Sequence, residues 1–210
     1  QFPIRARTTA SNLRSRFSLS SHQSLNFSII HEEGNTTEVE EMCTYQLANN
    51  EILVRIQAVW VGELERALTN GTIKCTESRV PGECFCGTIA GMGLEVDSTE
   101  YRLNDRVAVE TRYFCNECFH CTRGQTHLCE SGRHFGWAIN GGYQQYIVVQ
   151  QQCVHPFDRS VRFEHACLCP IVAHVSFGLT KANINPGDSV LVVGVSERCL
   201  ASVLLARCLG

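Results

Sequence analysis

Short apolar segments along the chain predict that residues 25–150 are mostly β-strand. The segment Glu51–Val61 (EILVRIQAVWV) alternates apolar and polar residues over much of its length, as a half-buried strand does. Gly87–Val96 combines four glycines or alanines with larger apolar residues, which predicts a tightly bent strand with close backbone approach. Further strands are expected at Ser24–Ile30, Asp105–Glu110 and Tyr143–Val149.

The pattern changes in the last forty or so residues. Pro170–Leu179 reads as the start of a helix, and Ser189–Val193 is a nearly unbroken apolar run, typical of a strand buried on both faces of a parallel sheet. Cys199–Leu209 (CLASVLLARCL) then predicts an apolar helix. A strand, a glycine turn and a helix in this order open a dinucleotide-binding βαβ unit.

Composition and charge exclude several classes of protein. Among 210 residues, 44% are hydrophobic and 19% charged, which is the composition of a globular chain. The length is enough for one full domain and part of a second. Eighteen Lys and Arg against 21 Asp and Glu give a net charge of −3, which argues against a nucleic-acid partner. Since no apolar run approaches the ~18 residues of a membrane span, we expect no membrane partner either.

The first 24 residues are expected to form a disordered or transit-like leader. Residues 1–31 contain four arginines, seven serines and no acidic residue, which is the composition of an organelle transit peptide. A disordered tail and mistranslated upstream sequence are the alternatives. Because the chain begins with Gln1, we expect a fragment, a processed form or an incomplete gene model. The expected location is the cytoplasm, with the mitochondrion as the alternative that the leader suggests.

Four of the 13 cysteines fall within fifteen residues and predict a metal site. They are Cys115, Cys118, Cys121 and Cys129, with the spacing C-x2-C-x2-C-x7-C. Four thiolates can close a tetrahedron around Zn²⁺ and leave no position for a substrate, so the zinc would be structural. A bacterial iron–sulfur run would place its fourth cysteine after three residues and before a proline, which is not the case here. His120 and His127 are expected to be bystanders.

This quartet, with Gly124 inside it, resembles the zinc lobe of medium-chain zinc-containing alcohol dehydrogenases. The flanking segments that resemble the same family are Glu51–Ile56, Leu103–Val107, Gly141–Tyr146 and Pro186–Gly194. The resemblance implies a mostly β GroES-like barrel domain with short helices over residues 25–180, including the zinc lobe at 112–132. It implies that residues 181–210 are the first β-α unit of an α/β Rossmann domain.

The resemblance implies hydride transfer between a small alcohol or aldehyde and NAD(P) as the activity, with a homo-oligomer as the candidate assembly. A catalytic zinc needs three protein ligands and an open position. At the first ligand position the family has cysteine and this chain has Gly62 or Val61, with Leu64 about where a proton-passing hydroxyl falls. The degenerate candidates for the remaining positions are Glu83 in place of histidine, Cys84 in place of an acid, and Cys169.

The glycine fingerprint that would bind the pyrophosphate of NAD(P) is degenerate as well. Gly194 is retained, whereas Ser196 and Cys199 stand where the family has the second and third glycines, and Glu197 adds a negative charge. Two functions therefore remain open. The first is a zinc-dependent alcohol dehydrogenase, and the second is an inactive zinc-binding GroES-like protein that serves as an interaction module or has no function.

Overall fold

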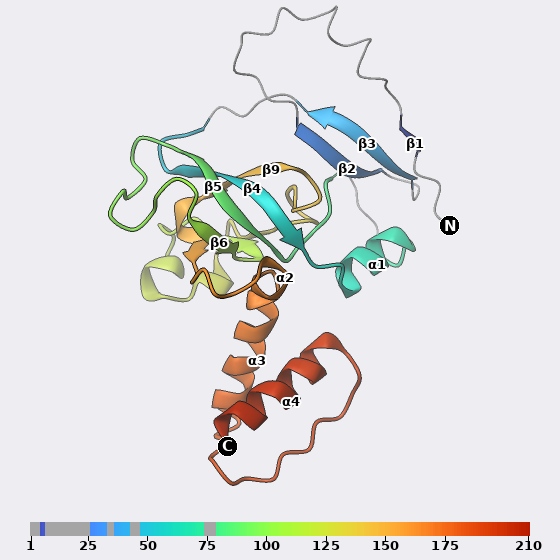
Figure 1. Cartoon of the computed structure of the whole chain (residues 1–210), viewed down its shortest axis with the longest axis vertical. Helices are drawn as coiled ribbons and strands as arrows, with labels where there is room; N and C mark the ends of the chain where they lie inside the picture. The colour runs from blue at the N-terminus through green and yellow to red at the C-terminus, as the bar shows by residue number, and fades with distance from the viewer. Residues whose placement is uncertain (1–4, 7–25, 33–35, 43–46, 74–78) are drawn as a thin grey trace, which may run out of the picture. The chain divides into compact units, whose positions relative to one another are not determined.

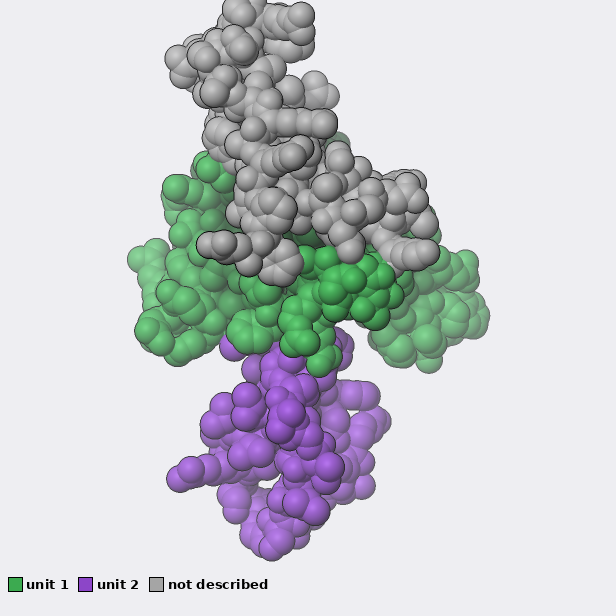
Figure 2. Space-filling view, turned by 90° about the vertical axis from the view of Figure 1, so that its right-hand side faces the viewer, with its two compact units in different colours: residues 1–167 green, residues 168–210 purple. Residues whose placement is uncertain are grey.

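The computed structural model describes residues 5–6, 26–32, 36–42, 47–73 and 79–210. The chain divides into two compact units, residues 1–167 and residues 168–210 (Figure 2). The described strands all belong to the first unit, whereas the second unit is built from two helices. Apart from Arg5–Ala6, the predicted leader lies outside the described residues. None of the described helices is long and apolar enough to cross a membrane.

The centre of the first unit is a five-stranded sheet whose neighbouring strands run antiparallel, in the order β10-β6-β5-β4-β9 (Figure 1). Its strands are β4 (Glu51–Val59), β5 (Phe85–Met92), β6 (Arg106–Val109), β9 (Tyr146–Gln150) and β10 (Val154–Pro156). The strands predicted from the alternating pattern are confirmed, with ends that differ by a few residues.

The first unit also contains smaller elements. A three-stranded sheet has the order β1-β3-β2, and a two-stranded sheet pairs β7 with β8. These strands are β1 (Arg5–Ala6), β2 (Asn26–Glu32), β3 (Thr36–Met42), β7 (Arg112–Tyr113) and β8 (Arg133–His134). The helical elements of the first unit are α1 (Glu63–Thr69), α2 (Phe163–Ala166) and the 3-10 turns η1 (Cys121–Arg123), η2 (Thr126–Leu128) and η3 (Gln151–Cys153).

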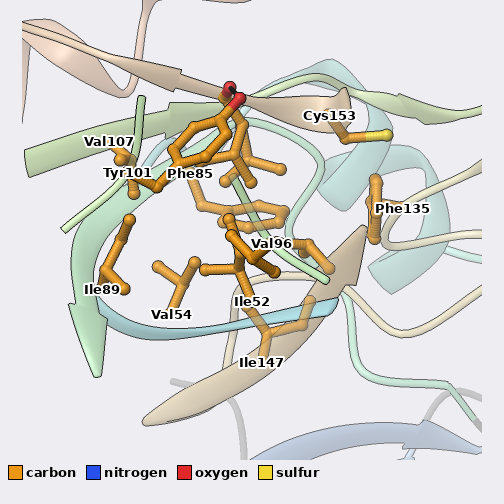
Figure 3. Packing of buried hydrophobic residues seen from close by; sticks show 13 residues of the cluster. Ile52, Val54, Phe85, Ile89, Val96, Tyr101, Val107, Phe135, Ile147 and Cys153 are labelled. Atoms are coloured by element: carbon orange, nitrogen blue, oxygen red, sulfur yellow. Dashed lines mark hydrogen bonds between the residues drawn. The ribbon is translucent and has the colours of Figure 1, made fainter. Parts of the chain in front are cut away.

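Side chains from one face of the sheet form the core (Figure 3). Alternate residues of β4, Ile52 and Val54, are fully buried, as the period of two predicts. They pack with Ile147 of β9 and with Phe85, whose ring meets Phe135 edge to face at 5.7 Å between centroids. The aromatic contact joins the sheet to the segment that follows β8.

Close backbone approach between β4 and β5 requires the predicted glycine. A Cβ on Gly87 would overlap the carbonyl oxygen of Arg55 on the neighbouring strand. We expect Gly87→Ala to lower the free energy of unfolding by about 1–3 kcal/mol, because the strands would have to separate. Urea denaturation measures this loss. Gly91→Ala on the same strand is the control, since its nearest neighbour would lie at 3.4 Å; an equal loss in both variants would contradict the steric explanation.

An ion pair at the edge of the sheet predicts a pH dependence. His155 Nε2 lies 3.1 Å from Glu110 Oε1, and this hydrogen bond raises the pKa of His155. A raised pKa stabilises the fold below the unfolded value of ~6.5, and the contribution is lost as the pH rises through the folded value. Because both side chains are about half exposed, the stabilisation is small.

We expect Glu110→Gln to return the pKa of His155 toward its ordinary value, as followed by NMR titration of the imidazole. Glu117→Gln removes an exposed carboxylate elsewhere in the unit and serves as the control. A His155 titration that is the same in wild type and Glu110→Gln would show that the hydrogen bond does not form in solution.

The second unit contains α3 (Cys169–Lys181) and α4 (Glu197–Leu209), which pack against each other. Both helices were expected from the sequence. The strand expected at Ser189–Val193 is not formed: the segment is irregular, with Leu191 and Val193 88% and 85% exposed. A strand exists through hydrogen bonds to a neighbour, and the described part of the chain offers this segment none.

Candidate metal centre

The four clustered cysteines lie on a loop that is closed by the β7–β8 pair. Arg112 and Tyr113 of β7 pair with His134 and Arg133 of β8, so both ends of the loop are held together. Within the loop, the left-handed backbone of Gly124 (φ +73°) ends η1, and its N–H donates to the carbonyl of Cys121 at 2.9 Å. This glycine makes the reversal that the sequence predicts there, because an L side chain rarely adopts that conformation.

The sulfurs of the quartet converge on one point. The Sγ atoms of Cys115, Cys118, Cys121 and Cys129 all lie within 4.8 Å of one another. Cys115 Sγ is 3.6 Å from Cys129 Sγ and 4.0 Å from Cys121 Sγ. A tetrahedron with Zn–S bonds of ~2.3 Å has sulfur–sulfur separations of about 3.8 Å. The spacing of these sulfurs therefore fits a zinc ion, and His120 and His127 do not belong to the group.

Backbone amides point at the sulfurs. The N–H of Cys118 donates to Cys115 Sγ, and the N–H of Cys115 donates to Cys129 Sγ, both at 3.4 Å. Hydrogen bonds from backbone N–H groups, that of Cys121 first, lower the pKa of Cys118 to about 6, and the Cys115 amide lowers the pKa of Cys129. Burial has the opposite effect on Cys121 and raises its pKa to about 12. Since thiolates are the metal-binding form, the amides favour metal binding at two of the four positions.

A buried carboxylate connects the two segments where the family resemblance places catalytic zinc ligands. Glu65 is 4% exposed; its Oε2 accepts the N–H of Gly62 at 2.8 Å, and its Oε1 accepts the N–H of Glu83 at 2.9 Å. Burial, followed by the negative charge of Glu65, raises the pKa of Tyr143. Glu65 is not among the residues predicted from the sequence, although it stands three residues after Gly62, the residue that precedes α1, which is a capping arrangement.

The predicted catalytic candidates do not form a second metal group among the described residues. The Glu83 carboxylate faces His134, with Oε1 3.7 Å from Nδ1. Cys84 is buried, and Cys169 is the exposed first residue of α3 in the other unit. Gly62 has no side chain to offer as a ligand. The residues present at these positions therefore do not fit a catalytic zinc site of the family's kind.

The predicted nucleotide loop has its own internal contacts. Ser196 precedes α4, and its hydroxyl accepts the N–H of Cys199 at 3.4 Å. Gly194 has a φ of +134°, and a Cβ on it would lie 2.6 Å from Cys199 Sγ. The Cys199 side chain thus fills the space beside the one retained glycine. Glu197 places a carboxylate in the first turn of α4, where a bound phosphate would need the opposite charge.

Comparison with known proteins agrees with this fold. An alcohol dehydrogenase of Moraxella sp. (strain TAE123) is 30% identical over 186 residues, which cover 87% of this chain and 54% of the relative. A sorbitol dehydrogenase of Bacillus subtilis (strain 168) is 27% identical over 195 residues, covering 90% of this chain and 54% of the relative. The chain thus spans about half the length of the curated relatives that it matches.

Among solved structures, a cobalt- and zinc-bound thermostable alcohol dehydrogenase from Pyrobaculum aerophilum superposes with a TM-score of 0.77 at 26% identity. The match covers 90% of this chain and 58% of that one. The predicted fold class is confirmed for its mostly β GroES-like domain, whereas the strand that would open the α/β domain is not formed among the described residues. The family model of the alcohol dehydrogenase GroES-like domain matches residues 48–159, more than half of the 210 residues, and the chain therefore belongs to this family.

Proposed function

We propose that the chain binds one zinc ion through its cysteine cluster, as a structural element of an oxidoreductase of the alcohol dehydrogenase type. The observation that supports this most directly is the convergence of four sulfurs within 4.8 Å, at separations that suit tetrahedral zinc. The ligands would be Cys115, Cys118, Cys121 and Cys129. When bound, the ion supplies a cross-link within the 112–132 lobe and no open coordination position for a substrate.

Metal analysis of the purified chain tests this proposal. After dialysis against a weak chelator, we expect one equivalent of zinc per chain. Two equivalents that both survive dialysis would show a second site that the described residues do not display. A chain without zinc that takes up none from solution would overturn the proposal.

The proposed activity of the oxidoreductase is hydride transfer between a small alcohol or aldehyde and NAD(P). Family membership supports it, together with relatives named alcohol dehydrogenase and sorbitol dehydrogenase. No step of this chemistry is assigned to a second zinc, because Gly62 offers no ligand and the Glu65 carboxylate accepts two backbone N–H groups instead. Since the space beside Gly194 is filled by Cys199, we expect this loop to add no pyrophosphate contact to NAD(P) binding.

The second candidate is a zinc-stabilised GroES-like module without dehydrogenase activity. The comparisons favour the first candidate, whereas the contacts of Glu65 favour the second. An assay of short-chain alcohols and polyols with NAD⁺ and NADP⁺ separates them. Turnover that is absent from a matched Cys118→Ser preparation supports the oxidoreductase, and absence of turnover from zinc-loaded protein supports the module.

A further inference from the structure

The lobe contains an arginine whose guanidinium hydrogen bonds go to the segment that returns to the fourth cysteine. Arg112 lies on β7, before the first ligand in the chain. Its Nη1 donates to the carbonyl of His127 at 2.8 Å, and its Nη2 donates to the carbonyl of Cys129 at 3.3 Å. One guanidinium therefore binds the two carbonyls on either side of Leu128, in the segment that brings Cys129 to the cluster.

A glycine makes room for this guanidinium. A Cβ at Gly132 would overlap Nη2, Nε and Cζ of Arg112. The N–H of Gly132 donates to the carbonyl of Cys129 at 3.0 Å, so this oxygen accepts from both Gly132 and Arg112. The carbonyl of the fourth ligand is thus fixed from two directions, and one of them depends on the absence of a side chain at position 132.

We infer that Arg112 is a positioning residue for the zinc ligand Cys129, an inference that rests on the proposed structural zinc site. The planar guanidinium fork binds two carbonyls with a geometry that a lysine ammonium cannot reproduce. Groups that orient a ligand without touching the metal typically change metal affinity by about 10–100-fold when removed.

Arg123 provides a matched control in the same lobe. Its Nη1 donates to the carbonyl of Phe119 at 3.0 Å, and its guanidinium stacks 3.5 Å from the centroid of the Phe119 ring. These contacts involve neither the carbonyl of a ligand nor the segment 127–132. Arg123→Lys therefore changes an arginine of the lobe but leaves the two hydrogen bonds from Arg112 to the His127 and Cys129 carbonyls, here called the Arg112 clamp, in place.

The experiment measures zinc release from the intact chain to an excess of a chromogenic chelator. We expect Arg112→Met to release zinc about 10–100-fold faster than wild type. The release rate of Arg112→Lys should lie between those of wild type and Arg112→Met, because lysine keeps the charge and can reach one carbonyl. Arg123→Lys should remain within about twofold of wild type, since no ligand-positioning contact is lost. If Arg112→Met does not fold, the comparison of Arg112→Lys with Arg123→Lys carries the test.

Cobalt substitution supplies a readout that a general loss of stability would not change. In the folded Co²⁺ protein, Arg112→Lys should alter the visible bands of the tetrahedral thiolate site, and Arg123→Lys should leave them as in wild type. Gly132→Ala should reproduce the Arg112→Met effect with the arginine still present. Release rates and cobalt spectra that are equal in Arg112→Lys, Arg112→Met and wild type would overturn the clamp alone. A wild-type chain that binds neither metal would overturn the zinc site and the clamp together.

Discussion

Replacing Cys118 with serine is expected to empty the metal site and to unfold the lobe at residues 112–132. A serine hydroxyl does not replace a thiolate as a ligand to structural zinc, and three sulfurs leave the tetrahedron open. In small sites, structural zinc contributes on the order of 10 kcal/mol of folding free energy. The stretch between the ligands has little apolar packing to hold it, because Phe119 and Leu128 are 60% and 49% exposed.

The rest of the first unit should survive this change. Its core is formed by Ile52, Phe85 and Ile147, which belong to the five-stranded sheet and lie outside the lobe (Figure 3). We therefore expect retained β-sheet circular dichroism together with rapid tryptic cleavage after Arg123, a residue of the lobe. Zinc analysis should give close to none.

Cys208→Ser is the matched control, because Cys208 is an exposed thiol on α4 outside the cluster. It should keep one equivalent of zinc and resist trypsin as wild type does. A Cys118→Ser protein that retains its zinc and its protease resistance would contradict the structural role of the metal.

The elements that sequence reasoning found are those with a strong local signal. The alternation of Glu51–Val61 and the small residues of Gly87–Val96 give β4 and β5, because the period of two and the glycine content act within one strand. The cysteine quartet was found for the same reason: its ligands lie within fifteen residues, and their spacing alone describes the loop.

Contacts between distant segments could not be foreseen. Glu65 accepts an N–H from Glu83, 18 residues away, and Arg112 binds the carbonyl of Cys129, 17 residues away. The capping arrangement of Glu65 indicates its contact with Gly62 only. The contacts of Glu65 with Glu83 and of Arg112 with Cys129 follow from no spacing, because they depend on how α1 and the lobe fold back. The run Ser189–Val193 shows the converse: its composition favours a strand, but a strand forms only beside a partner.

Removing the Glu65 carboxylate is expected to destabilise the first unit strongly. In Glu65→Ala, the N–H groups of Gly62 and Glu83 would both lose their acceptor in a part-buried place. Each unpaired buried N–H costs about 1–3 kcal/mol, so the free energy of unfolding should fall by about 2–6 kcal/mol. Glu65→Gln keeps one carbonyl oxygen and turns an NH₂ toward the other amide, and its loss should be intermediate.

Urea denaturation, with zinc analysis of each variant, measures this effect and locates it. Because the hydrogen bonds of Glu65 go to Gly62 and Glu83, which lie outside the cysteine lobe, the variants should retain the zinc of wild type while their unfolding midpoints fall. Glu63→Ala is the control: Glu63 is an exposed acid in the first turn of the same helix, where losing a charge costs within about 1 kcal/mol. If Glu65→Ala unfolds at the same urea concentration as Glu63→Ala, the carboxylate does not hold the two segments together. The ordering wild type, Glu65→Gln, Glu65→Ala would show that both oxygens of the carboxylate stabilise the fold through their hydrogen bonds to the backbone.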